Sequence, residues 1–435
     1  MSSLNNNIPD GFKMTELGLL PEEWETTKLG DLFEIKQGKA LSPEHRRGIS
    51  PRPFLRTANV FWGYLDLTNV DSMDFTDAEV SQLKLMPNDL LVCEGGDIGR
   101  TAIWRDESKV CCYQNHLHRL RTTREDVHPL FYMYWMQVAH LLFGLYGGTG
   151  NKTTIPNLSQ SRLKSFILPL PPLPQQQEIA RVLSTIQKAV ETQDKIIAAA
   201  RELKKSLMRH LFTYGPVPVT EADKVLLKET EIGPVPEHWE VVRLGELGEI
   251  VTGTTPSTKV AEYYGGSHMF ITPGDMHNAK YVSKTKQYLS DKGLAVSRAL
   301  PSDSILVVCI GSLGLTAMTS VDGCATNQQV NAIIPNHKID SHYCFYAVTY
   351  YSYLLSNLAG GVTIPIVNKS NFLKFIIPLP SMSEQQKITS ILSAVDNKIE
   401  AEENRKAALQ ALFKTMLHHL MTGKVRVNKL EAIVL

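Results

Sequence analysis

The 435-residue sequence lacks the signals that direct a chain into or across a membrane. No apolar run approaches the ~20 residues that a membrane-spanning helix needs. The first residues, MSSLNNNIPDG, hold neither the charged segment nor the apolar segment of a signal peptide. These absences predict a cytoplasmic chain with no membrane partner.

Cysteine is scarce, and the signatures of catalysis are missing. The six cysteines form no CxxC pair and no metal-like spacing with histidine, so we interpret them as reduced core thiols and expect no metal. There is no Asn/Asp-Pro-Pro-Tyr methylase motif, no Gly-rich cofactor loop after a strand, and no nuclease-like acidic cluster. The segment closest to a phosphate loop, residues 147–154, has Asn151 where glycine should precede Lys152. The sequence therefore predicts no catalytic residues.

Charge is balanced overall but uneven along the chain. The net charge is +1, which argues against a protein that coats nucleic acid through bulk charge. Residues 28–56 hold seven basic and three acidic side chains, and residues 100–124 hold six and two. Such local basic excess suits a DNA-reading surface, although solvated loops have the same composition.

An internal repeat governs the organisation of the chain. Residues 15–40, TELGLLPEEWETTKLGDLFEIKQGKA, match residues 230–255, TEIGPVPEHWEVVRLGELGEIVTGTT, at an offset of 215. The shared pattern predicts a buried tryptophan (Trp24, Trp239), a short helix at Leu-Gly-Asp/Glu-Leu, and a strand that turns at Gly38 or Gly253. Aromatic segments at 131–143 and 342–355 are expected to be buried helices.

Each repeat ends in a long amphipathic helix. Prolines before about Gln175 exclude a helix there, and no proline or glycine follows until Gly215. The second helix is expected from about Glu384 to Met421, with Ser383–Gln386 as its capping box. Each helix has a narrow apolar stripe, so we expect the two to pair as an antiparallel coiled coil, with parallel pairing as the alternative. The predicted core residues are Ile179, Leu183, Ile186, Val190, Leu203, Leu211, Ile388, Leu392, Val395, Ile399, Leu412 and Leu420.

These features predict an α+β fold in which two related mixed α/β domains are separated by an antiparallel coiled coil of two long helices, related by a pseudo-twofold repeat. At ~1.5 Å per residue, each helix would be a rod of roughly 57 Å.

The paired TExGxxPxxWExxxLGxL segments (15–32 and 230–247), the PLPPLPQQQEI and PLPSMSEQQKI segments (169–179 and 378–388) and the two long helices resemble the specificity subunit of type I restriction-modification systems. The resemblance covers roughly residues 15–421. It implies a non-catalytic subunit of a restriction endonuclease and adenine-specific methyltransferase complex in host defence. Two target-recognition domains would each read one half of a split, asymmetric site in double-stranded DNA, and the coiled coil would set the length of the unread spacer.

The resemblance also implies partners and domain boundaries. Two modification (methyltransferase) subunits would dock on the helices, and restriction (translocase/nuclease) subunits would join that core. S-adenosylmethionine, ATP and Mg²⁺ are expected only in the partner subunits, with no cofactor in this chain. The expected segments are an N-terminal segment (1–14), the first target-recognition domain (15–170), the central helix (171–213), a linker (214–229), the second target-recognition domain (230–380), the distal helix (381–422) and a C-terminal tail (423–435).

Candidate DNA contacts are polar residues on expected turns, because Arg reads guanine, Asn or Gln reads adenine, and Lys and hydroxyls hold phosphates. The first-domain candidates are Gln37, Lys39, Arg46, Arg47, Arg56, Asn59, Arg100, Gln114, Asn115, Asn151 and Lys152. The second-domain candidates are Thr252, Thr254, Thr255, Lys259, Asp275, Ser312, Asn327, Gln328 and Gln329. Our specific hypothesis is that Arg56, Arg100 and Gln114 reach the major groove.

Three alternatives stay open: a specificity subunit of a type IIB-like fused restriction and modification enzyme, a scaffold that binds only protein, and a stand-alone nuclease, for which we find no carboxylate site. The target bases, the spacer length and the role of the tail are left undetermined, with packing of the tail near the N-terminus as one arrangement.

Overall fold

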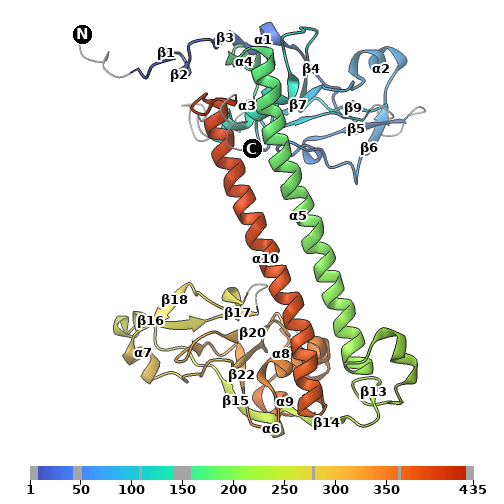
Figure 1. The fold of residues 1–435 in the computed structure, drawn as a ribbon, viewed down its shortest axis with the longest axis vertical. Helices are drawn as coiled ribbons and strands as arrows, with labels where there is room; N and C mark the ends of the chain where they lie inside the picture. Colours follow the sequence, from blue (N-terminus) through green and yellow to red (C-terminus); the bar gives the residue numbers. More distant parts are fainter. Residues whose placement is uncertain are drawn as a thin grey trace. The chain divides into compact units, whose positions relative to one another are not determined.

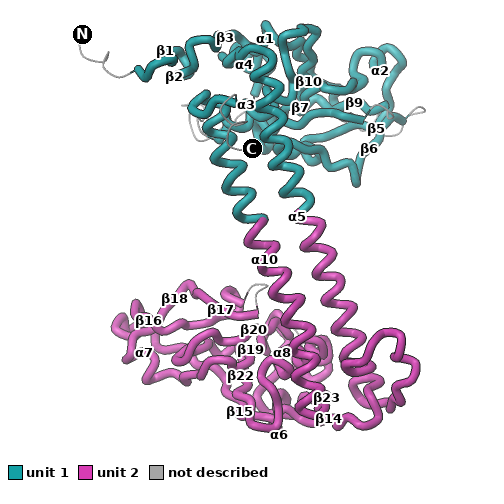
Figure 2. The backbone as a smooth tube through the Cα atoms, viewed as in Figure 1, with its two compact units in different colours: residues 1–192, 406–435 teal, residues 193–405 magenta. Residues whose placement is uncertain are grey.

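The computed structural model describes residues 8–42, 51–106, 110–141, 158–276, 280–360 and 364–427. The chain divides into two compact units (Figure 2). Unit 1 contains residues 1–192 and 406–435, and unit 2 contains residues 193–405. Two long helices, α5 (Leu173–Tyr214) and α10 (Met382–Met421), are labelled in Figure 1, and each contributes one part to each unit, as the colours of Figure 2 show. None of the helices in the described ranges is long and apolar enough to cross a membrane.

In its described residues, unit 1 contains short strands, four α-helices and a 3-10 turn besides its parts of the two long helices. The strands are β1 (Phe12–Thr15), β2 (Gly18–Pro21), β3 (Glu25–Lys28), β4 (Glu34–Gln37), β5 (Pro51–Leu55), β6 (Asp71–Asp74), β7 (Leu90–Cys93), β8 (Thr101–Ile103), β9 (Cys112–Tyr113), β10 (Leu117–Arg121) and β11 (Ile167–Leu170). The helices are α1 (Leu29–Leu32), α2 (Asp77–Leu83), α3 (Pro129–Leu141), α4 (Gln160–Lys164) and the 3-10 turn η2 (Thr57–Asn59).

Two sheets form the body of unit 1. One is antiparallel in the order β4-β10-β7-β8, and the other has the order β6-β5-β9, with β5 and β9 parallel. Strand β7 is buried on both faces, since its even side chains pack with α3 and its odd ones with β5 and β9. This explains why LLVC is a continuous apolar run rather than an alternating one.

Unit 2 repeats this design. Its strands are β12 (Leu227–Lys228), β13 (Val235–Pro236), β14 (Glu240–Arg243), β15 (Gly248–Thr252), β16 (Tyr264–Ile271), β17 (Tyr281–Val282), β18 (Gln287–Leu289), β19 (Ile305–Val308), β20 (Thr316–Thr319), β21 (Ala325–Thr326), β22 (Val330–Pro335) and β23 (Ile376–Leu379). Its helices are α6 (Leu244–Leu247), α7 (Asp291–Ala295), α8 (Ser341–Tyr351), α9 (Lys369–Phe372) and the 3-10 turns η3 (Val219–Lys224), η4 (Ala261–Tyr263), η5 (Pro273–Asp275) and η6 (Ser352–Leu358). The sheets have the orders β15-β22-β19-β20-β17 and β18-β16-β21.

The predicted anchors of the repeat are confirmed. Trp24 and Trp239 are fully buried, and the Leu-Gly-Asp/Glu-Leu segments form α1 and α6. Each tryptophan donates its indole N–H to the start of a long helix: Trp24 to Gln175 Oε1 at 2.8 Å, and Trp239 to Glu384 Oε1 at 3.1 Å. A buried indole needs such a partner, so the tryptophan fixes where the helix begins relative to the domain.

The glutamine-rich segments have a structural explanation. Gln176 is fully buried in the first turn of α5, where it accepts from His128 N and donates to Asp126 O and Pro171 O. Gln385 does the same in α10, accepting from Asp340 N and donating to Lys338 O and Pro380 O. One amide thus satisfies three backbone groups at the junction of the strand, the long helix and the aromatic helix.

The capping box of α10 differs from the prediction. Ser381 rather than Ser383 is the cap, because Glu384 N donates to Ser381 Oγ and Ser381 N donates to Glu384 Oε2 at 3.2 Å. The helix begins at Met382, three residues before Gln385, and this places Glu384 at the position that the motif requires. Glu384 also accepts from His238 Nε2 at 2.9 Å.

Within each unit the two long helices run antiparallel, as predicted. In unit 1, Ile179 and Leu183 near the start of α5 share a core cluster with Leu417 and Leu420 near the end of α10. In unit 2, Leu211 near the end of α5 shares a cluster with residues 388 and 392 near the start of α10. Full burial of a leucine or isoleucine contributes roughly 1.5–3 kcal/mol, so these contacts are sufficient to hold the pair.

Two predicted core residues of the coiled coil, Leu203 and Leu412, are instead exposed, at 53% and 46%. The adjacent residues, Lys204 and Phe413, take the inward positions: Lys204 pairs with Asp396 at 2.6 Å, and Phe413 packs on Tyr134. The apolar pattern pointed to leucine because an ion-paired lysine at an inward position carries no hydrophobic signal. The other predicted residues are buried or half-buried, and Gln193 and Glu402 are buried between the helices at positions that the stripe did not include.

The described part of the tail packs on the N-terminal hairpin in unit 1. Arg426 donates to Gly11 O at 3.1 Å, pairs with Glu23, and lies over the Phe12 ring. Gly423 makes the turn at φ +65°, and a side chain there would place its Cβ 2.3 Å from Pro21 Cγ. This confirms packing near the N-terminus for residues 423–427.

Candidate nucleic-acid interface

In unit 1 the predicted contact residues lie at one edge of the two sheets, because of strand direction. Strands β4 and β7 run one way and β10 and β8 the other, so the C-terminal ends of the first pair and the N-terminal ends of the second share an edge. The ends of the parallel strands β5 and β9 join it through a bridge between Lys39 and Gln114. We call this the first polar edge, which consists of Gln37, Lys39, Arg56, Arg100, Gln114 and Asn115.

Hydrogen bonds tie the loops of the first polar edge together. Gln37 Nε2 donates to Asn115 O at 2.9 Å, and Gln114 N donates to Leu55 O at 3.0 Å. Arg100 Nη2 donates to Thr57 O at 3.2 Å. The chain turns at Gly38, where a Cβ would lie 2.2 Å from Tyr113 O, so only glycine permits this close approach. The edge is therefore a defined surface rather than a set of independent loops.

The two arginines of the hypothesis, Arg56 and Arg100, come together with Gln114 but already have acidic neighbours. Arg56 Nε lies 3.1 Å from Asp71 Oδ2, and Arg100 Nη1 lies 3.0 Å from Asp97 Oδ2. The Asp97 side chain is 72% exposed, and exposed ion pairs contribute only about 0–1 kcal/mol. A phosphate or a base could therefore replace Asp97 as a partner at little cost.

Two first-domain candidates use their polar atoms inside the unit. Lys39 Nζ donates to Asp74 O at 2.8 Å and to Glu79 Oε2 at 2.7 Å, and this hydrogen bond is the main cause of the lowered pKa of Glu79. Asn59 is buried, accepts from Arg56 N, and donates to two backbone carbonyls at 3.0 Å. Arg46, Arg47, Asn151 and Lys152 lie outside the described residues.

Unit 2 places its candidates at the equivalent edge. Strands β15 and β19 end there, and β22 and β20 begin there. Thr252 Oγ1 donates to Asn331 Oδ1 at 2.7 Å, and Thr255 Oγ1 to the exposed Gln328 Oε1 at 2.7 Å. Asn327 Nδ2 donates to Gln329 Oε1 at 2.9 Å. The second polar edge consists of Thr252, Thr254, Thr255, Ser312, Asn327, Gln328 and Gln329.

The two remaining second-domain candidates are Asp275 and Lys259. Asp275 accepts from Thr272 N, Thr272 Oγ1 and Lys286 N at 2.9, 2.7 and 3.0 Å, and although burial alone would raise its pKa, these hydrogen bonds lower it. Its carboxylate is thus used to shape the η5 turn. Lys259 is exposed on the loop that follows β15.

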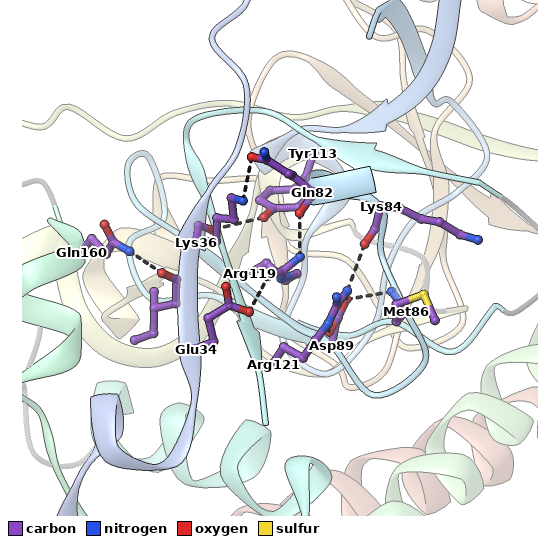
Figure 3. Close-up of polar contacts among 11 residues, drawn as sticks. Glu34, Lys36, Gln82, Lys84, Met86, Asp89, Tyr113, Arg119, Arg121 and Gln160 are labelled. Carbon is purple, nitrogen blue, oxygen red and sulfur yellow. Dashed lines mark hydrogen bonds and ion pairs between the residues drawn. The ribbon is translucent and has the colours of Figure 1, made fainter. Parts of the chain in front are cut away.

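Part of the basic excess at residues 100–124 is used inside unit 1. Arg119 is buried, with Nη2 3.0 Å from Glu34 Oε2 and Nη1 donating to Gln82 O, as Figure 3 shows. Arg121 makes two hydrogen bonds, of 2.6 and 2.7 Å, with the buried Asp89 (Figure 3). These acids lie 85 and 32 residues away in sequence, so a local charge count could not include them.

Sequence reasoning missed Glu94, which follows β7 directly at the first polar edge. Its carboxylate is 7% exposed and accepts from Gln37 Nε2 at 2.6 Å. His118 Nε2 lies 3.9 Å from the same carboxylate and 2.9 Å from Leu158 O. The available signal was a charged residue at the end of an otherwise apolar strand, where the second repeat has Cys309.

Comparisons with known proteins agree on one family. The sequence model described as "Type I restriction modification DNA specificity domain" matches residues 21–201 and 236–411. The putative type I restriction enzyme MjaX specificity subunit of Methanocaldococcus jannaschii is 26% identical over 438 residues, covering 96% of this chain and 97% of that protein. The HindI specificity subunit of Haemophilus influenzae is 33% identical over 201 residues, covering 44% of this chain and 42% of that protein.

A solved structure shares the fold. The crystal structure of the S subunit of a type I restriction-modification system from M. genitalium aligns with a TM-score of 0.56 at 17% identity, covering 96% of this chain and 98% of that one.

Proposed function

The chain belongs to the type I restriction-modification DNA specificity family, and from this premise we propose that it is the DNA sequence-recognition subunit of such a complex. The first polar edge would read one half of a split site in double-stranded DNA, and the second polar edge the other half. The observation that supports the proposal is that equivalent positions of the two edges hold chemically different residues. Where the first edge has Gln37 and Glu94, the second has Thr252 and Cys309.

Unequal edges on one scaffold fit an asymmetric target. Two identical surfaces would suit a palindrome, whereas Gln37 and Thr252 offer different hydrogen-bonding groups at the same place in the fold. Exposed amides such as Gln328 suit base edges, and Arg56 and Arg100 suit guanine or phosphate.

The chain would be non-catalytic and would act through partners. Two modification subunits would dock on the long helices, and restriction subunits would join them. S-adenosylmethionine, ATP and Mg²⁺ would be bound by those partners.

The recognition role is tested by comparing DNA methylation in cells with and without this gene. We expect a split, asymmetric methylated motif that is present only with the gene. Full-length protein assembled with modification subunits should bind that motif more weakly as salt rises, because phosphate contacts release counterions. A methylome that does not change with the gene, or DNA binding that does not depend on salt, would contradict the proposal.

The long helices would set the unread spacer. Inserting one heptad directly after Gln193 of α5 and one directly before Glu402 of α10, residues that are hydrogen-bonded to each other in unit 2, preserves the antiparallel pairing. Seven residues add ~10 Å of helix, or roughly three base pairs at ~3.4 Å each. We expect a longer spacer between unchanged half-sites, and an unchanged spacer would refute this role of the helices.

A further inference from the structure

The two hydrogen-bond partners of the Gln37 side-chain amide fix its orientation. Its Nε2 donates to Glu94 Oε2 at 2.6 Å and to the backbone oxygen of Asn115 at 2.9 Å. A carboxylate and a backbone carbonyl can only accept, so the atom facing both of them must be the nitrogen. The two N–H groups of the amide are therefore both used.

What remains of Gln37 is an acceptor. The side chain is exposed at the end of β4, and its Oε1 has no hydrogen-bond partner among the residues that the structure describes. A free glutamine can pair with adenine through an N–H and an oxygen together, donating to N7 and accepting from N6. Gln37 cannot donate in this way without giving up a hydrogen bond to Glu94 or Asn115.

Glu94 keeps this arrangement in place. Its carboxylate is 7% exposed, and a buried carboxylate deprived of a donor is costly, so the Gln37 N–H is held firmly. Its negative charge also lies directly behind the amide, which disfavours approach of the acceptor atoms of guanine or thymine and favours an amino group.

We propose that Gln37 reads, through Oε1 alone, a base that carries an amino group in the major groove, either adenine N6 or cytosine N4, and that Glu94 is the positioning residue that enforces this polarity. This inference rests on the proposed function, in which the first polar edge contacts DNA.

The second unit has a different arrangement at the same place. Cys309 stands where Glu94 stands, and Thr252 donates its hydroxyl proton to Asn331 Oδ1 at 2.7 Å. No carboxylate lies behind Thr252 at the Cys309 position, so the polarity imposed by Glu94 belongs to the first half-site only.

The experiment uses the full-length chain assembled with modification subunits and the target identified from methylation. Gln37→Ala should lose discrimination at a single base pair of one half-site. At that position the wild type should prefer adenine or cytosine. Replacing adenine by purine, or cytosine by 2-pyrimidinone, removes only the amino group and should weaken binding about 2- to 10-fold, the range of one hydrogen bond. The same analogue placed in the spacer controls for weaker base pairing.

Two further variants separate positioning from a merely structural role. Glu94→Gln removes the negative charge behind the Gln37 amide, so discrimination between amino and keto bases should fall at that position alone. Glu249→Gln, an exposed carboxylate on β15, is the control and should change nothing. Thermal unfolding of each variant confirms that it folds.

The outcomes are distinguishable. A wild-type complex that does not bind DNA refutes the proposed function itself. A complex that binds, but prefers guanine or thymine at the Gln37 position, or binds the amino-free analogue as tightly as the natural base, overturns the inference while leaving the proposed function intact. A Glu94→Gln variant that folds and keeps the full discrimination between amino and keto bases also overturns the role given to Glu94.

Discussion

Two tyrosines at equivalent places in the repeat offer a quantitative test of how each domain is held to its long helix. In unit 2, Tyr346 of α8 donates its hydroxyl to Asp396 Oδ2 of α10 at 2.6 Å. In unit 1, Tyr134 of α3 donates to Gln187 Oε1 of α5 at 2.9 Å. Asp396 and Gln187 are 209 residues apart, which is the offset at which residues 169–179 match residues 378–388 at the start of the long helices. Phenylalanine at either tyrosine removes one oxygen and keeps a buried ring.

The two substitutions should differ in cost because the Tyr346 hydroxyl has a charged acceptor and also contacts Ser393 Oγ at 3.1 Å and Lys280 Nζ at 3.3 Å, whereas Tyr134 bonds a neutral amide. A hydrogen bond to a charged group contributes about 1.5–3 kcal/mol, and one to a neutral group about 1 kcal/mol. Asp396 keeps its ion pair with Lys204 at 2.6 Å, so Tyr346→Phe does not leave the carboxylate without a partner. We therefore expect a loss of about 2 kcal/mol for Tyr346→Phe and about 1 kcal/mol for Tyr134→Phe.

Hydrogen exchange with urea, read by mass spectrometry on peptides from α3 and α8, measures the free energy of opening in each unit separately. Tyr353→Phe, on a ring that is 62% exposed, is the matched control and should change stability by less than about 0.5 kcal/mol. If Tyr134→Phe cost as much as Tyr346→Phe, the charge of the acceptor would not be the deciding factor, and the reasoning would fail.

Three other outcomes are expected. Leu183→Ala, at a fully buried site, should lower the free energy of unfolding in urea by about 3 kcal/mol, and Leu203→Ala, at an exposed site, by less than about 0.5 kcal/mol. Equal losses would show that Leu203 is a core residue. Gly423→Ala introduces a Cβ 2.3 Å from Pro21 and should release residues 424–427, seen as faster proteolysis of the C-terminus. Burial alone would raise the pKa of Glu384, but its hydrogen bonds lower it below the usual 4.5. The ionised Glu384 side chain should therefore stabilise the fold fully above pH 4.5, and this stabilisation should be lost as the pH falls through the lower pKa of the folded protein. Glu384→Gln should make the loss of stability in acid less steep.

The repeat made the scaffold predictable because the sequence pattern of each element occurs twice in the chain. The tryptophan anchors, the short helices and the long antiparallel helices all follow from residues that recur in both halves. Because the two helices share one pattern, one wrong assignment of a core position was made in both of them. Leu203 and Leu412 occupy equivalent positions, so an assignment one residue away from Lys204 and Phe413 was made in both helices. Only the ion pair to Asp396 reveals why lysine faces inward.

The candidate interface was predictable in location but not in chemistry. Polar residues at strand ends, such as Gln37 and Gln114, lie together because strand direction brings those ends to one edge. Which of their atoms are available depends on partners distant in sequence. Glu94 lies 57 residues from Gln37, and no periodicity or composition could indicate that its carboxylate uses the amide N–H of Gln37.

The buried pair between the long helices also depends on the two repeats being unequal. Gln193 donates to Glu402 in unit 2, and these residues are 209 positions apart, so they are the same position in the two repeats. Two identical repeats would place one residue type at both positions. Two glutamines can satisfy each other in a buried interface, whereas two glutamates would repel. Of the two residue types present here, only glutamine could occupy both positions, so the glutamate of this pair requires repeats that are not identical.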